Sequence, residues 1–440
     1  MIGVALYLKL VHVVDFEANE LRDDYFQDPH AYFARMREKE AVTAVTLPDS
    51  SNRVWMVTRY DDVRGALADP RLYKDWAGKL TPPDWEPDVV EGFLSKHLLN
   101  LDPPDHTRLR KLVNKAFTPR RVAGLRPRVA EITASLLDAM ESRAASGSGV
   151  VDLIEEFAFP LPVTVICELV GIPVEDRDEF QAWSHATVSS VASPEEFQAA
   201  GLAMYRYFTD LVAAKRERPG DDLLSALIQT QDSGDSLDER ELIAMLFLLL
   251  IAGHETTANL IASGTLALLS HPAEFARLRS SPALLPGAVE ELLRYCSPVN
   301  HATERFTVSP VEIGGETIPG REWVLAVISS ANRDPSRFPD PDRLDLLRET
   351  SGHIAFGHGM HYCLGAPLAR LEAEIAFGAL LARFPGLSLA APESSLRWRP
   401  SSLIHGLESL PVRLREPTAS PRFPRFPRMR RLRIGRDHFA

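Results

Sequence analysis

The sequence HIAFGHGMHYCLG, residues 353–365, holds one of only three cysteines in a chain of 440 residues. Glycines precede and follow Cys363, and an apolar pattern at helical spacing then runs from 366 to 384, where Pro385 and Gly386 end it. The stretch therefore predicts a loop, a cysteine and a helix, in that order. A sulfur just before a helix N-terminus lies at the positive end of the helix dipole, which favours its thiolate form.

An isolated cysteine usually serves as a small buried hydrophobic side chain. Cys363 has more around it than packing requires, because three glycines and an aromatic residue surround it: Gly357, Gly359, Gly365 and Phe356. Glycines permit unusual backbone angles and let a flat group approach closely. The stretch therefore predicts a thiolate site that receives a flat group.

A second chemical feature follows an apolar helix. Ser236-Leu237-Asp238-Glu239 predicts a capping box that opens a helix ending near Ser270, about 50 Å long at about 1.5 Å per residue. Residues 242–252 are apolar on every face, so this helix should be buried, and the run is too short to span a bilayer. The helix continues with the polar segment Ala252-Gly253-His254-Glu255-Thr256-Thr257.

Polar groups inside a buried helix need partners or a purpose. One interpretation is a helix bend in which a threonine bonds its own backbone. The other is an oxygen pocket in which Glu255 and Thr256 form an acid–alcohol pair that relays protons. Gly253 lowers helix stability by about 1 kcal/mol relative to alanine but clears space beside the helix. We favour the second interpretation because the cysteine loop occurs in the same chain.

Other segments give weaker signals. His106 and Arg110 share a helix face after an irregular region, 70–100, and a solvated basic face is the default explanation. Glu291 and Arg294 also share a face, as many surface pairs do. Further predicted helices span 29–39, 61–67, 126–143, 151–170, 175–190, 194–217 and 284–295, and predicted β-structure spans 54–58, 311–318, 323–328 and 410–414.

Together these segments resemble the cytochrome P450 family, whose motifs they follow in order over about residues 20–416. The resemblance implies a mainly α fold with small β-sheets, shaped as a triangular prism, with a long central helix over the haem. It implies a haem-thiolate domain at 1–416. The remaining residues, 417–440, hold seven arginines and recurring prolines, and we expect a disordered basic tail there.

The resemblance also implies a cofactor, haem b, with the Cys363 thiolate as the axial ligand of its iron. Phe356 should pack beside the sulfur, with Gly357 and Gly365 in the haem-binding loop. The basic residues expected at the haem propionates are His106, Arg110, Arg305, His353 and His361. Buried propionates require such charge partners.

On the opposite side of the haem, Ala252 and Gly253 should make room for oxygen, and Glu255 and Thr256 should deliver protons. The expected substrate pocket includes Ile251, Val299, Asn300, His301 and Ile404. Because most of the surroundings are apolar, we expect a lipophilic substrate.

Behind the haem, the resemblance implies a structural cluster of Glu291, Arg294 and Arg343. Arg343 belongs to the segment Pro341-Asp342-Arg343-Leu344, in which Leu344 replaces the more usual phenylalanine.

The implied activity is that of a monooxygenase acting on a small molecule with O2, in the manner of members that tailor macrolides and other polyketides in secondary metabolism and antibiotic biosynthesis. Electrons would come from NAD(P)H through a ferredoxin or flavodoxin and its reductase. One basic region suits the docking of an acidic electron-donor protein, and solvation of a charged surface is the alternative explanation. Its residues are Arg108, Lys111, Lys115, Arg120 and Arg121. Alternatives are a peroxygenase driven by hydrogen peroxide and a non-catalytic haem-binding sensor.

Composition limits the remaining possibilities. The net charge of −11 is unfavourable for nucleic-acid binding. Three widely separated cysteines, Cys167, Cys296 and Cys363, argue against a disulfide framework and for a reducing compartment. Residues 1–14 are apolar but too short to cross a bilayer, so we expect an N-terminal arm, no membrane span and a cytoplasmic protein.

Overall fold

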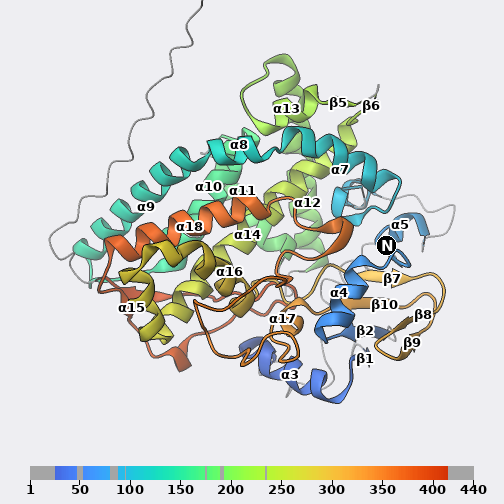
Figure 1. Cartoon of the computed structure of the whole chain (residues 1–440). Coiled ribbons are helices and arrows are strands. Elements are labelled where there is room, and N and C mark those ends of the chain that lie inside the picture. Colours follow the sequence, from blue (N-terminus) through green and yellow to red (C-terminus); the bar gives the residue numbers. More distant parts are fainter. Residues whose placement is uncertain are drawn as a thin grey trace, which may run out of the picture.

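The central helix α14 (Glu239–Ser270) crosses the middle of the molecule, and the other long helices pack around it (Figure 1). The computed structural model describes residues 25–46, 53–79, 88–94, 96–173, 176–188, 193–232 and 235–414. The expected N-terminal arm at 1–14 and basic tail at 417–440 lie outside these residues. The helices are α3 (Pro29–Lys39), α4 (Tyr60–Ala68), α5 (Trp76–Lys79), α6 (Val89–Leu94), α7 (Asp105–Ala116), α8 (Pro119–Gly124), α9 (Arg126–Ser146), α10 (Pro160–Val170), α11 (Arg177–Val188), α12 (Pro194–Glu217), α13 (Leu223–Gln229), α15 (Pro272–Ser280), α16 (Leu285–Cys296), α17 (Ile328–Ala331) and α18 (Ala366–Arg383).

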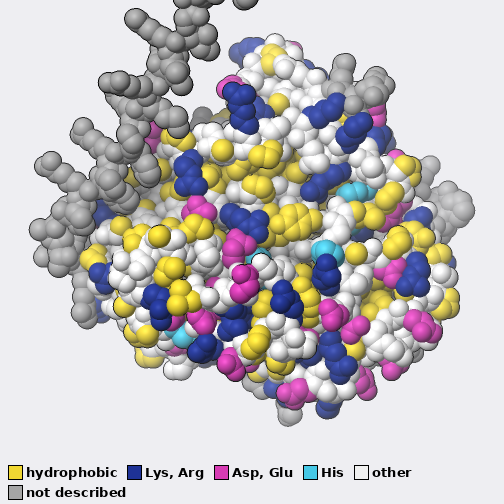
Figure 2. Space-filling view, in the orientation of Figure 1, with side chains coloured by type: hydrophobic (Ala, Val, Ile, Leu, Met, Phe, Trp, Pro, Cys, Tyr) yellow, Lys and Arg dark blue, Asp and Glu magenta, His cyan; other side chains and the backbone are white. Residues whose placement is uncertain are grey.

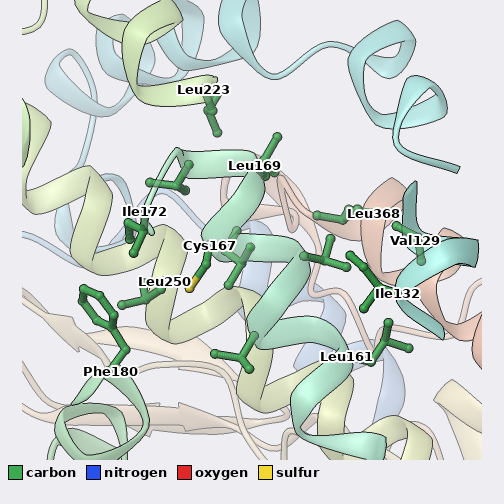
Figure 3. Packing of buried hydrophobic residues seen from close by; sticks show 14 of the residues in the cluster. Val129, Ile132, Leu161, Cys167, Leu169, Ile172, Phe180, Leu223, Leu250 and Leu368 are labelled. Atoms are coloured by element: carbon green, nitrogen blue, oxygen red, sulfur yellow. The ribbon is translucent and has the colours of Figure 1, made fainter. Parts of the chain in front are cut away.

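The largest apolar core lies where α10 packs against α14, with α9 and α18 beside them. Cys167 of α10 is fully buried there, near Leu250 of α14 (Figure 3). Within the described residues, α14 alone has the length and apolar character to cross a bilayer, and most of it is covered by other parts of the protein. Its apolar character is that of a core helix.

The β-structure lies mainly at one side of the helical part (Figure 1). One sheet has the order β1 (Val42–Thr46), β2 (Arg53–Val57), β10 (Trp323–Ala326), β7 (Arg305–Thr307) and β3 (Leu72–Tyr73). Strand β10 pairs parallel to β2 and antiparallel to β7. This sheet therefore brings Lys74, just after β3, close to Arg305 at the start of β7.

Smaller sheets join distant parts of the chain. Strand β12 (Pro411–Arg413) pairs with both β11 (Ser388–Leu389) and β4 (Val150–Asp152). Strand β5 (Gln231–Asp232) pairs with β6 (Asp235–Ser236). The predicted hairpin is confirmed: β8 (Val311–Ile313) and β9 (Glu316–Ile318) are joined by Gly314 and Gly315, whose φ angles are 58° and 87°. Two consecutive positive φ angles are what a tight hairpin turn needs.

Three local predictions differ from the structure. The capping box of α14 uses Asp238 and Glu241, because Ser236 belongs to strand β6. Residues 151–170 are not one helix, since they comprise the end of β4, a wide helical turn at Ile154–Ala158 and α10. The region 70–100, expected to be irregular, contains β3, α5 and α6, while residues 80–87 and 95 lie outside the described part of the chain.

Candidate active site

Cys363 follows a loop that two glycines shape. Gly357 and Gly359 have φ angles of 73° and 77°, in the left-handed region that favours glycine. The backbone N–H of Cys363 donates to the carbonyl oxygen of Phe356 at 3.0 Å and closes the loop. Gly365 differs, because its φ angle of −79° is open to any residue. A Cβ there would lie 3.8 Å from Cys363 Sγ, an ordinary contact.

Opposing influences act on the Cys363 thiol. Burial raises its pKa, whereas the backbone N–H groups of Gly365 and Ala366 and the charges of Arg110 and Arg370 lower it. The two N–H groups belong to the N-terminus of α18, as the helix-dipole argument predicts. Burial has the larger effect, so the pKa of the thiol stays above its usual value in the chain alone. A stable thiolate here requires an additional positive partner such as a metal ion.

Basic side chains crowd together next to this loop. The rings of His106 on α7 and His361 in the cysteine loop have centroids 4.4 Å apart. The Nε2 atoms of both rings are buried and have no hydrogen-bond partner among the described residues. Burial lowers the pKa of His361 to about 2, together with the charges of its neighbours Lys74, His106, Arg305 and Arg110.

Lys74 and Arg305 are themselves buried. Burial lowers the pKa of Arg305 to about 10. Burial, followed by the charge of Arg305, lowers the pKa of Lys74 to about 7. The ammonium of Lys74 donates to Thr303 Oγ1 at 2.5 Å and to the carbonyl oxygen of Glu304 at 2.9 Å. The opposing carboxylates that act on Lys74 are Asp102 and Glu304, fewer than the basic groups gathered here. Buried positive charge of this kind calls for an anionic partner.

The polar side chains of α14 divide between two sides of the helix. Glu255 is only 3% exposed, and its Oε2 accepts from Arg399 Nη2 at 3.1 Å and from Asn259 Nδ2 at 3.4 Å. Thr256 Oγ1 donates to the carbonyl oxygen of Ala252 at 3.0 Å, so the hydroxyl bonds its own backbone. Ala252 is exposed although α14 crosses the middle of the molecule (Figure 1). The part of the chain that the structure describes therefore leaves open the helix face that Ala252 and Thr256 share.

Gly253 faces away from that uncovered surface. A Cβ at Gly253 would lie 3.0 Å from Cδ1 and Cγ1 of Ile166 on α10. This approach is tighter than ordinary van der Waals contact, so the glycine lets α10 and α14 pack closely. The geometry gives Gly253 a packing role against α10, and Ala252 is the residue on the open side.

A buried ion pair joins Glu291 and Arg294 on α16, as predicted. Arg343, the expected third member, does not reach it: its guanidinium is exposed and pairs with Asp345 at 2.7 Å. Arg348 takes that place, with Nε 3.2 Å from Glu291 Oε1. The correction follows from the turn after Leu344, which carries Arg348 back to α16.

Comparison with known proteins agrees with this geometry. The cytochrome P450 family matches residues 22–208 and 203–399. The chain belongs to the cytochrome P450 family. Cytochrome P450 107B1 of Saccharopolyspora erythraea is 52% identical over 402 residues, which cover 89% of this chain and 96% of that protein. The mycinamicin IV hydroxylase/epoxidase of Micromonospora griseorubida is 44% identical over 394 residues, 88% of this chain and 97% of that protein.

Among solved structures, the tirandamycin C-bound P450 monooxygenase TamI superposes with a TM-score of 0.81. It is 48% identical, and the match covers 89% of this chain and 99% of TamI. The expected fold is confirmed, and the chain is a P450 monooxygenase. Family membership implies a haem bound through a cysteine thiolate.

The residues present in this P450 fit a haem. Of its three cysteines, Cys167 and Cys296 are buried, and Cys363 alone is partly accessible. The Nε2 atoms of His106 and His361, which no described residue contacts with a hydrogen bond, and the cations beside them suit a group with two carboxylates. The donor set therefore matches both the iron and the propionate side of the cofactor.

His353, also expected at the propionates, has a carboxylate partner within the chain. Its Nε2 is 2.8 Å from Glu290 Oε2, and Arg370 donates to both oxygens of the same carboxylate at 2.6 and 2.8 Å. Although burial raises the pKa of Glu290, hydrogen bonds from Arg370 and His353 lower it to about 2. The guanidinium of Arg370 also lies 4.4 Å from the ring centroid of Phe356. The structure therefore gives His353 a partner in α16.

The predicted pocket residues beyond α14 lie together. An isolated β-bridge pairs Val299 with Ile404. Asn300 is buried, and its Nδ2 donates to the carbonyl oxygen of Ser402 at 3.1 Å. His301 is buried as well, with Nε2 lacking a partner among the described residues. On α14, Ile251 is half-buried beside exposed Ala252.

Sequence reasoning missed several residues of the site. Asn259 had a usable signal, because it lies four residues after Glu255 on the same helix face. Lys74 and Arg399 had none, since their partners Thr303 and Glu255 are 229 and 144 residues away along the chain. Only the folded chain brings such positions together.

Proposed function

We propose that this P450 binds haem b through the thiolate of Cys363 and inserts one atom of O2 into a lipophilic small molecule of the polyketide or macrolide type. The observation that carries this proposal is the uncovered face of α14. A central helix that is otherwise buried leaves Ala252 exposed next to the Thr256 hydroxyl. Because protein interiors are closely packed, a core helix has an open face of this kind where a bound cofactor or substrate occupies the space.

The haem would be held by a sulfur and by buried cations. His106, Arg110, Arg305 and His361 are the proposed partners of its propionates, and Lys74 adds a fifth basic group. When bound, the haem supplies the activation of O2, so that one oxygen atom enters a C–H or C=C bond of the substrate and the other leaves as water. Phe356 anchors the cysteine loop through its carbonyl oxygen, which accepts the N–H of Cys363.

The chain's own residues would control protons on the side of α14. Thr256 Oγ1 holds a proton at the uncovered face, where the hydroxyl can give it up after leaving the carbonyl of Ala252. Glu255 is the acid that replenishes it. General acids and bases of this kind typically contribute about 10²–10⁴-fold to a rate. His254, next to them, is not a suitable donor near neutrality because burial lowers its pKa.

We infer that electrons come from NAD(P)H through a ferredoxin or flavodoxin and its reductase. In balance, substrate, O2, NAD(P)H and one proton give the oxygenated product, NAD(P)⁺ and water. Figure 2 shows several Lys and Arg side chains over α7 and the neighbouring helices, with exposed hydrophobic side chains below them. Among the predicted basic residues, Arg108 pairs with Glu241 and Arg121 pairs with Asp221. Lys111, Lys115 and Arg120 are exposed.

The substrate class rests on the relatives. One acts on mycinamicin IV by its name, and TamI was solved with tirandamycin C. The pocket would be bounded by Ile251, Val299, Asn300, His301 and Ile404, with the buried imidazole Nε2 of His301 as a polar contact. A reducing compartment such as the cytoplasm suits the three free cysteines.

A visible-spectrum titration tests this function. The purified protein is titrated with macrolides and other polyketides, and with terpenoids, steroids and fatty acids. A low- to high-spin shift with the macrolide or polyketide group alone supports the proposed substrate class. A shift with another group alone contradicts that class, and a protein without bound haem contradicts the proposal as a whole.

A further inference from the structure

Arg399 links the proposed acid of α14 to a segment near the C-terminal end of the described chain. Its Nη2 donates to Glu255 Oε2 at 3.1 Å and to Asn259 Oδ1 at 2.9 Å. Asn259 Nδ2 in turn points to Glu255, at 2.7 Å from its carbonyl oxygen and 3.4 Å from Oε2. The three side chains form a closed ring of contacts in which Glu255 is almost wholly buried.

This ring holds the Glu255 side chain turned away from Thr256. Successive residues of a helix point about 100° apart, since a turn takes about 3.6 residues. Thr256 bonds Ala252 on the uncovered face, whereas Glu255 points to Arg399. A proton can pass between them only when the Glu255 side chain leaves the position in which Arg399 and Asn259 hold it.

Arg399 belongs to a short antiparallel segment, residues 396–408. Its backbone N–H donates to the carbonyl oxygen of Gly406 at 2.8 Å, and a β-bridge pairs Trp398 with Leu407. The far end of this segment bonds to the predicted substrate pocket: the N–H of Asn300 donates to the carbonyl oxygen of Leu403, and Ile404 bridges to Val299. One small unit therefore carries both the partner of the acid and part of the pocket wall.

Gly406 packs closely against the hydrogen-bonded ring of Arg399, Asn259 and Glu255. A Cβ at Gly406 would lie 2.0 Å from Asn259 Oδ1 and 2.7 Å from Arg399 Nη2. Real Cβ atoms do not approach so closely, so any side chain there would push the ring apart. The φ angle of Gly406 is not in the left-handed region, so space around the ring is what requires glycine.

We propose that Arg399 is a positioning residue that sets the place of Glu255 and makes it depend on what occupies the pocket. A substrate pressing on Ile404 moves the segment 396–408 and with it Arg399. Glu255 is then released toward Thr256 only when the pocket is filled. The proposal rests on the role of Glu255 as proton donor given above.

The experiment uses the haem-loaded protein with a surrogate ferredoxin, its reductase, NAD(P)H and a compound that gives a high-spin shift. Oxygen uptake and peroxide release are measured, together with the solvent deuterium isotope effect on oxygen uptake. Arg399→Gln should abolish the dependence of peroxide per NAD(P)H and of the isotope effect on the compound, about threefold or more in the parent, because nothing then holds Glu255 away from Thr256 when the pocket is empty. The spin-shift Kd should not rise, because no ligand contact is lost and binding no longer has to displace Arg399 from Glu255. Arg399→Lys should restore part of this dependence, since it keeps a positive charge near Glu255 but not the guanidinium geometry.

The matched control is Arg397→Gln, because Arg397 is exposed on the same segment and lies two residues away. It should behave as the parent protein. A double-mutant cycle tests the link to the pocket: at saturating compound, Ile404→Ala should change the peroxide fraction in the parent but not in Arg399→Gln. Additive effects, or an Arg399→Gln protein indistinguishable from Arg397→Gln, would overturn the proposal.

Glu255→Gln separates the positioning role of Arg399 from the proton-donor role of Glu255. If Glu255→Gln alters peroxide release and Arg399→Gln does not, the positioning role is wrong while the role of Glu255 stands. If Glu255→Gln itself changes nothing, the proton-donor role fails first. Neither result depends on identifying a product, so the assignment of a polyketide substrate is tested separately.

Discussion

Glu291 and Arg294 form a doubly hydrogen-bonded ion pair in which neither side chain has exposed surface. Arg294 Nε lies 2.7 Å from Glu291 Oε2, and Arg294 Nη2 lies 2.9 Å from Oε1. The remaining nitrogen, Nη1, donates to the carbonyl oxygens of Asn332 and Pro341, both at 2.9 Å. The pair therefore ties α16 to the segment that leads toward the cysteine loop.

Arg294→Met should strongly destabilise the protein. Removing one partner of a buried ion pair leaves the other charge uncompensated, which typically costs about 3–5 kcal/mol. Urea unfolding followed by circular dichroism measures the free energy of unfolding. The control is Arg277→Met, since Arg277 forms an exposed pair with Glu274. A loss below about 1 kcal/mol in Arg294→Met would contradict a structural role for the pair.

Arg348 and Arg343 should differ in the same measurement. Arg348 is nearly buried and contacts Glu291, so Arg348→Ala removes a charge partner and several bonds to backbone carbonyls, including that of Asp340. We expect a loss of about 2 kcal/mol or more. Arg343 is exposed beside Asp345, so Arg343→Ala should change the free energy of unfolding by about 0.5 kcal/mol at most. Equal losses in the two variants would contradict the assignment.

These two arginines show what sequence could and could not provide. The long helix α14, the hairpin at Gly314 and Gly315 and the cysteine before α18 follow from local patterns, and each was predicted. The choice between Arg343 and Arg348 depends on how the chain turns after Leu344, which spacing along the sequence does not specify. The same is true of Gly253, whose neighbour Ile166 comes from another helix. Contacts between distant segments required the folded chain.

Cys363→Ser should abolish the thiolate-haem absorption spectrum. A serine hydroxyl cannot provide the soft, electron-rich ligand that the thiolate gives to iron. The carbon monoxide difference spectrum of the reduced protein measures this ligation, and circular dichroism checks the fold. The control is Cys167→Ser, because Cys167 is fully buried in the apolar core of α10 and α14. Cys167→Ser should lose stability but keep the spectrum, whereas an unaltered spectrum in Cys363→Ser would refute the assignment.

Thr256→Ala should retain haem but divert electrons from product to peroxide. The variant removes the hydroxyl that lies on the uncovered face of α14, so a proton can no longer be held there. Peroxide released per NAD(P)H oxidised is the measurement. Thr256→Ser keeps the hydroxyl and is the matched control, expected to resemble the parent. Unchanged product per NAD(P)H in Thr256→Ala would exclude the hydroxyl from proton delivery.

Lys74 should make the stability of the haem-free chain depend on pH. Its pKa is about 7 in the folded chain, lowered first by burial and then by Arg305, against 10.5 for an ordinary lysine. Between these values the unfolded chain binds more protons at this residue than the folded chain does. The free energy of unfolding therefore rises with pH across this window, by up to about 1.4 kcal/mol per pH unit from Lys74. Below pH 7 both states are protonated, and this contribution no longer changes with pH.

The difference between the parent and Lys74→Met isolates that contribution, because other groups titrate in both proteins. Urea unfolding at pH 7 and pH 9 should show a steeper rise for the parent than for Lys74→Met. Lys96→Met, at an exposed position, should keep the parent's slope. Two propionates beside Lys74 would favour its charged form and raise its pKa, so loading the chain with haem should flatten the difference. If the free energy of unfolding rises equally steeply with pH in the parent and in Lys74→Met without haem, the pKa of Lys74 is not lowered by burial as the structure indicates. If the difference persists with haem bound, Lys74 does not face the propionates.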